Sequence, residues 1–164
     1  MSGIPSVLRA LYDGERALEQ NLLATAERHP AEHEVHHVAT DLARWSHEQA
    51  ERIARAAEPH GLHLSGPEGR RPSHALDEPP DPDLRLLNDL RTLHLAATGN
   101  SLDWEMLAQA AQATGDGHLL ALASACHPQT LRQLRWTNTM IKTLAPQLLS
   151  SANGQAAVAG QGVP

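Results

Sequence analysis

Four residues of this chain carry ionisable side chains that could do chemistry in a helical protein: Glu15, His47, Glu105 and His127. Carboxylate and imidazole groups can exchange a proton, form ion pairs or coordinate a metal ion. Each glutamate lies in or beside an apolar stripe with helical spacing. A charge in a core is unfavourable unless another group pairs with it, protonates it or coordinates through it. The chemistry of the chain therefore depends on what lies against Glu15.

The stripe around Glu15 belongs to a helix predicted for residues 6–28. The stripe consists of Leu8, Leu11, Glu15, Leu18 and Leu22. His29-Pro30 then forms a short connection to a second helix, predicted for residues 31–58. The apolar stripe predicted for that helix consists of Val35, Val38, Leu42, Trp45, Gln49 and Ile53. Because the connection is so short, the two helices should form an antiparallel hairpin.

A second hairpin is predicted after residue 81. Asp81 is a suitable N-cap, Pro82 suits the first helical position, and Gly115-Asp116-Gly117 is a stop signal. The stripe predicted for this third helix consists of Leu86, Leu90, Leu93, Ala97, Trp104, Leu107 and Ala111, with a kink or break expected at 98–100. The fourth helix is predicted for residues 118–149, with Leu120, Ala123, Leu131, Leu134, Ile141 and Leu148 facing the core and a kink or restart at Pro128.

Residues 59–82 are too rich in proline and glycine to form a helix. An extended segment gains about 3.3 Å per residue. It could therefore return the chain along a helix of roughly 40 Å, so that the third helix runs parallel to the second. The alternative is a flexible linker between two separate hairpins. We favour the crossover because the two hairpins need each other to bury their stripes.

Residues at the same height in an antiparallel hairpin lie equally far from its turn. Glu15 is then level with Arg44 and Trp45, and His47 lies within one turn, as does Glu48. In the second hairpin, Glu105 is level with His127. Each hairpin thus offers one glutamate on its first helix and one histidine nearby on its second.

This pattern resembles the ferritin-like superfamily. The resemblance rests on Glu15, Glu105, His47 and His127, on the long crossover, and on residues 11–16, which look like the first-helix signature of small bacterial stress-related members. It implies an all-α four-helix bundle with a metal site made by a glutamate from the first and third helices and Glu-x-x-His from the second and fourth.

The chain departs from that motif where the other two glutamates should stand, because those positions hold Arg44 and Ser124. Three interpretations stay open. The four residues form an altered, possibly mononuclear, iron, manganese or zinc site, with Glu48 as a possible further ligand. Or these residues and Arg44 form a buried polar network, with an ion pair between Arg44 and Glu15 in the place of the metal, in a metal-free bundle that has a structural or protein-interaction role. Or the heights are shifted by a turn and the residues lie on the surface.

A literal Glu-x-x-His at residues 34–37 is a weaker candidate for such a site. It lies near the first hairpin turn, almost three turns from the height of Glu15. The same short stretch contains His29, His33, His36 and His37. We expect a solvated polar helix end there.

Length and composition set the remaining expectations. The 164 residues suit one bundle domain at 1–149, followed by a disordered tail at 150–164. The net charge of −6 without a basic cluster argues against nucleic-acid binding, and the single Cys126 excludes an internal disulfide. No apolar run is long enough to span a membrane, so a cytoplasmic location is expected. A homodimer is expected, and no reaction is assigned.

Overall fold

The computed structural model describes residues 3–66 and 81–159, and within these ranges all regular structure is helical. Four long helices and a short 3-10 turn follow one another: α1 (Ile4–Arg28), α2 (His33–Ala57), η1 (Glu58–His60), α3 (Pro82–Thr114) and α4 (Gly117–Ala159). The predicted all-α four-helix bundle is confirmed. Among the helices of the described residues, none combines the length and apolar character that crossing a membrane requires.

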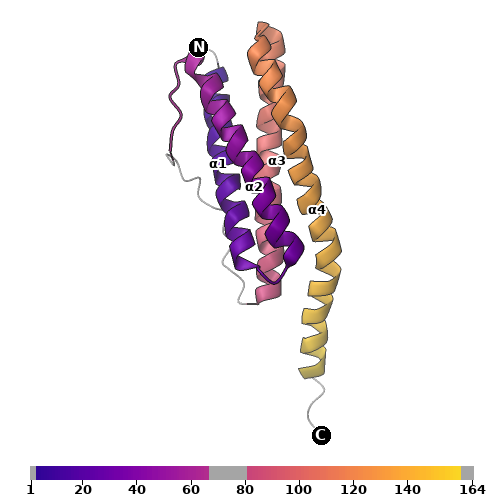
Figure 1. The fold of residues 1–164 in the computed structure, drawn as a ribbon. Coiled ribbons are helices and arrows are strands. Elements are labelled where there is room, and N and C mark those ends of the chain that lie inside the picture. The colour runs from indigo at the N-terminus through magenta and orange to yellow at the C-terminus, as the bar shows by residue number, and fades with distance from the viewer. Residues whose placement is uncertain (1–2, 67–80, 160–164) are drawn as a thin grey trace.

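The helices form two antiparallel hairpins, α1–α2 and α3–α4, which pack side by side (Figure 1). α3 runs parallel to α2 and antiparallel to α1, as the crossover prediction requires. At one end of the bundle, Arg28 and His29 bond to Asp89, with His29 Nε2 2.7 Å from Asp89 Oδ2. At the other end, His60 Nε2 lies 3.5 Å from Asp116 Oδ2. Most of the proline-rich crossover, residues 67–80, lies outside the described residues.

The predicted signals at both ends of α3 are confirmed. The Asp81 side chain accepts a hydrogen bond of 2.9 Å from the Asp83 amide. Gly115 ends the helix with φ of 70°, a left-handed conformation that glycine adopts without strain. Between these ends α3 is one helix, so the break expected at 98–100 does not occur. A helix interior tolerates a single glycine at a modest loss of stability.

α4 is longer than the sequence predicted. It continues through Pro128 and Pro146 and past Leu149 to Ala159, so the part of the predicted disordered tail before residue 160 is helical. Its last part extends beyond the ends of the other three helices (Figure 1). Alanine is frequent there, and alanine has the highest helix propensity. Residues 160–164 lie outside the described residues.

The predicted core stripes are correct for α1 and α3, where every residue of the predicted stripe is buried. They are shifted in the other two helices. In α2, Val38 and Trp45 are only partly buried, whereas Ala39, Ala43 and Ser46 lie inside. In α4 the buried residues are Leu119, Leu122, Ala123, Cys126, Thr130, Gln133, Thr137 and Met140. The seam between α2 and α4 is thus built from small and polar side chains.

α1 and α3 approach each other closely at Gly14. A Cβ atom at this position would overlap the Oδ1 atom of Asn100 and lie 3.2 Å from its Cγ atom. Because Asn100 is itself buried, glycine is the residue that allows this close approach. The contact brings the next residue of α1, Glu15, directly against α3.

Candidate functional site

Glu15 lies in the centre of the bundle with no solvent exposure. The indole N–H of Trp104 on α3 donates a hydrogen bond of 3.3 Å to Glu15 Oε1. Ser46 from α2 and Asn100 from α3 also face the carboxyl group. Neither makes a well-formed hydrogen bond to Oε2, which is left without a partner, as is Asn100 Nδ2. The carboxyl group is therefore shielded from bulk solvent and only partly satisfied by protein donors.

Burial raises the pKa of Glu15 from its ordinary value of 4.5 to about 7. Desolvation is the main cause, because a carboxylate loses its hydration in a dry core. The side chains of Ser46, Trp104 and Asn100 act in the opposite direction and lower this pKa by favouring the charged form. Near neutral pH Glu15 therefore exchanges a proton in the middle of the fold.

A second layer of polar side chains joins α2 to α4 beside Glu15. Gln133 Nε2 donates to Ser46 Oγ at 2.9 Å and to the Leu42 carbonyl at 3.2 Å. Thr130 Oγ1 donates to Gln49 Oε1 at 3.3 Å. Because Ser46 Oγ accepts from Gln133, its own hydroxyl proton is available to the Glu15 carboxyl group. Glu15 and this layer thus form one continuous polar zone across the bundle.

Cys126 lies in the core near this zone. Burial raises the pKa of its thiol to about 11, and Arg52 only partly offsets that rise. A thiol with so high a pKa is protonated at neutral pH and is a weak nucleophile. Cys126 is therefore a small buried side chain of the core rather than a reactive thiol.

His47, the first predicted histidine ligand, lies on the surface rather than beside Glu15. Its side chain is 46% exposed, with Nδ1 3.0 Å from Glu19 Oε1 and Nε2 3.2 Å from Glu51 Oε1. The predicted height was correct, but one helical position turns a side chain by about 100°. Ser46 therefore points inwards and His47 points outwards. Glu48, the possible further ligand, is also exposed.

Glu105 and His127 do lie side by side, as their heights predicted. His127 Nδ1 is 3.8 Å from Glu105 Oε2, and its Nε2 is 2.9 Å from Ser101 Oγ. The Glu105 side chain is 57% exposed, so this pair is on the outer side of the α3–α4 hairpin. The pair and Glu15 thus belong to different parts of the bundle.

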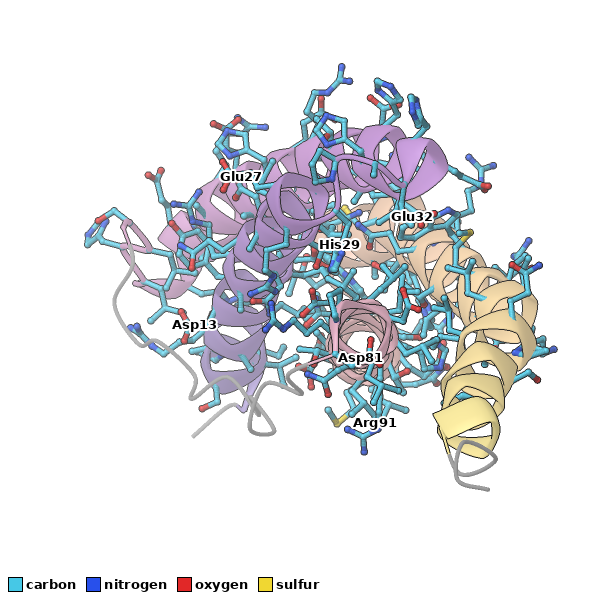
Figure 2. The ribbon with its side chains drawn as sticks, turned by 90° about the horizontal axis from the view of Figure 1, so that it is seen from below. Asp13, Glu27, His29, Glu32, Asp81 and Arg91 are labelled. Carbon is cyan, nitrogen blue, oxygen red and sulfur yellow. The ribbon has the colours of Figure 1, made fainter. Side chains whose placement is uncertain are left out.

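The residues that replace the missing glutamates are also outside the core. Arg44 is exposed and pairs with Asp41, so it does not form the ion pair with Glu15 that one interpretation required. Ser124 is exposed on α4. Near the first hairpin turn, His36 Nδ1 lies 2.8 Å from the Ala26 carbonyl oxygen, while His33 and His37 are exposed. Figure 2 shows His29 and Glu32 at this end of the bundle.

The structure thus places the four predicted ligands in three separate locations. Glu15 is in the core, His47 is on the surface of α2, and Glu105 with His127 is on the surface of α3 and α4. Within residues 3–66 and 81–159, no three histidine, cysteine, aspartate or glutamate side chains converge as a metal would require. Heights within a hairpin do not decide which side chains face the core.

Three partners of Glu15 were not among the predicted site residues: Ser46, Asn100 and Trp104. Trp104 was assigned only to the apolar stripe, and Asn100 to a break in the helix. The signal that could have identified Asn100 and Trp104 is Gly14. A glycine beside a core glutamate indicates a close helix approach, and α3 is the antiparallel neighbour of α1.

Comparisons with known proteins leave the chain without an assigned family. No protein-family model, curated protein or solved structure gives a significant match to it. None of these comparisons ties the four-helix bundle to the ferritin-like proteins, so that resemblance stays a prediction from the sequence.

Proposed function

We propose that this chain is a ferritin-like bundle that serves as an interaction module, pairing with a second copy of itself through α3. In this proposal the central carboxyl group binds a proton and not a metal ion. The observation that carries the proposal is an apolar stripe on the outer face of α3. Its three members, Leu95, Leu102 and Met106, are 48%, 61% and 51% exposed.

These three residues share one side of the helix because they are spaced by seven and four positions. Arg91, one turn before Leu95, points away from the other helices (Figure 2). Leu131 of α4, 37% exposed, is level with Leu102 in the α3–α4 hairpin and adds to the same side. Apolar side chains gathered in this way on a protein surface mark an interaction site.

The stripe is complementary to itself when two copies of α3 cross in opposite directions. Leu95 and Met106 are equally far from the midpoint between Gly99 and Leu102. A two-fold axis at that midpoint would place Leu95 of one copy against Met106 of the other. It would also place Leu102 over Gly99, where there is open space in the monomer. Such mutual pairing is the requirement for a symmetric dimer.

Replacing Leu102 with glutamate should convert the dimer to a monomer. The substitution places a charge in the middle of the apolar contact of both copies, while the exposed position leaves the fold intact. Light scattering after size-exclusion chromatography should give twice the chain mass of 17.7 kDa for the wild type and 17.7 kDa for Leu102→Glu at the same concentration.

Leu23→Glu is the matched control, since Leu23 is a comparably exposed leucine on α1, away from α3. This variant should remain dimeric. A wild-type chain that stays monomeric as its concentration rises would contradict the proposal. A dimer that persists in Leu102→Glu, or that Leu23→Glu disrupts equally, would assign the interface to another surface.

A metal-binding function is the second candidate, and the adjacent Glu105 and His127 side chains favour it. We expect tag-free protein titrated with Zn²⁺, Mn²⁺ or Fe²⁺ to show no stoichiometric binding by calorimetry, because one carboxylate and one imidazole leave a tetrahedral ion short of protein ligands. Near-stoichiometric binding that is lost in Glu15→Ala/Glu105→Ala and retained in Glu48→Ala would restore the altered-metal interpretation.

A further inference from the structure

A pocket of about 480 Å³ lies at the end of the bundle where α2 ends and α4 begins. Four of its lining residues have nitrogen-containing side chains that can donate hydrogen bonds: Arg52, Arg55, His60 and His118. Ala56, Leu119 and Leu122 contribute an apolar wall. None of the lining residues belongs to α3 or is a partner of the Glu15 carboxyl group, so neither role considered so far uses the pocket.

The two arginines are spaced by three positions on α2 and therefore lie on one side of that helix. Within the described parts of the chain, neither of them forms a hydrogen bond or an ion pair. The carboxylate one turn before Arg55 is Glu51, and it is already held by His47 Nε2 at 3.2 Å. Both arginines are exposed and line the pocket.

The one carboxylate among the lining residues is Asp116. It is the residue before α4, where its Oδ1 accepts the Leu119 amide at 3.1 Å and its Oδ2 faces His60 Nε2 at 3.5 Å. Its charge is therefore directed at its own helix and at His60 rather than at the arginines. The start of α4 adds the positive end of a helix dipole on the same side of the pocket.

We propose that this pocket binds a small organic phosphate, with the phosphate group on Arg52 and Arg55 and the organic part against Leu119 and Leu122. A guanidinium group offers a planar pair of N–H donors that matches the oxygens of a phosphate. A phosphate monoester carries about two negative charges near neutral pH, which two guanidinium groups can balance. The volume suits a compact ligand, since sites for small molecules begin near 300 Å³.

Phenyl phosphate is a suitable probe because it combines a phosphate group with a flat apolar group. Isothermal titration calorimetry on the full chain should show binding at one site per chain. Arg52→Gln/Arg55→Gln should weaken it at least about tenfold, because the variant loses the charge-assisted hydrogen bonds to the phosphate group. Arg132→Gln/Arg135→Gln removes the same charge from an exposed part of α4 and should bind like the wild type.

Two further probes separate the parts of the proposal. Inorganic phosphate should bind more weakly than phenyl phosphate, and benzyl alcohol should not bind. Equal affinity for the two phosphates would overturn the role of the apolar wall. Unchanged affinity in Arg52→Gln/Arg55→Gln, or an equal loss in the control pair, would overturn the site itself. Circular dichroism of each variant establishes that it is folded.

Discussion

The free energy of unfolding should fall by about 3 kcal/mol as the pH rises from 4.5 to above 7, through the proton on Glu15. In the folded chain the pKa of this group is about 7, whereas its ordinary value is 4.5. Between these values the folded chain holds a proton that the unfolded chain has released, so raising the pH favours unfolding. The stabilisation is fully present below pH 4.5 and is lost as the pH passes through 7.

Glu15→Gln should remove this part of the pH profile, because glutamine has a similar shape and does not titrate. At pH 8 it should be more stable than the wild type by roughly 1–3 kcal/mol, less than the full difference because the hydrogen bond from Trp104 becomes weaker. Urea unfolding at a series of pH values, followed by circular dichroism, measures both quantities.

The matched control is Glu48→Gln, which removes the charge of an exposed glutamate on α2. Its stability should follow the wild-type profile. If wild type and Glu15→Gln gave parallel profiles, the Glu15 carboxyl group would be hydrated in solution and not dry.

Trp104→Ala should destabilise the fold by about 3–5 kcal/mol, the largest effect expected of a single substitution in this chain. Trp104 is among the largest fully buried side chains, and its ring belongs to the cluster formed by α1, α2, α3 and α4. Truncation leaves a cavity in that cluster and also removes the one well-formed donor to Glu15. Thermal and urea unfolding at pH 5 and pH 8 provide the measurement.

Trp104→Phe separates the two causes, because it keeps an aromatic ring but lacks the N–H group. Its penalty should be smaller at pH 5 than at pH 8, where the charged carboxylate needs the donor most. The difference should disappear when the variant also carries Glu15→Gln. Trp45→Phe, at a partly buried tryptophan of α2, should show no such pH dependence. Penalties for Trp104→Phe that are equal at both pH values would mean that the hydrogen bond contributes little.

The sequence predicted where the helices of this fold lie in the chain better than it predicted which side of each helix faces the core. In α1 and α3 the core is made of leucines at regular spacing, so the buried side is evident from the pattern. In α2 and α4 the buried side carries alanines, Ser46, Thr130 and Gln133. A search for large apolar residues therefore selects Trp45 and Leu131, which stand beside the core.

The prediction that four residues form one site was wrong for the same reason. Heights along a hairpin follow from the position of its turn, and they correctly brought His127 beside Glu105. They carry no information on rotation, so they also suggested His47, whose neighbour Ser46 is the residue that faces inwards. The α1–α3 contact that supplies Trp104 and Asn100 lies between the hairpins and depends on the crossover. Heights within a single hairpin cannot reveal it.

The order of the helices has a consequence for the folding pathway. Each hairpin is made of contacts between neighbours in the chain, which form quickly, whereas the Trp104–Glu15 hydrogen bond joins residues 89 positions apart. Ser46 reaches Glu15 from within the first hairpin, but Trp104 and Asn100 arrive only with the second. Glu15 therefore becomes fully buried only when the hairpins dock, and we expect proton uptake at this carboxyl group to accompany docking near neutral pH. Alkaline conditions should then weaken the docking of one hairpin on the other more than the formation of either hairpin.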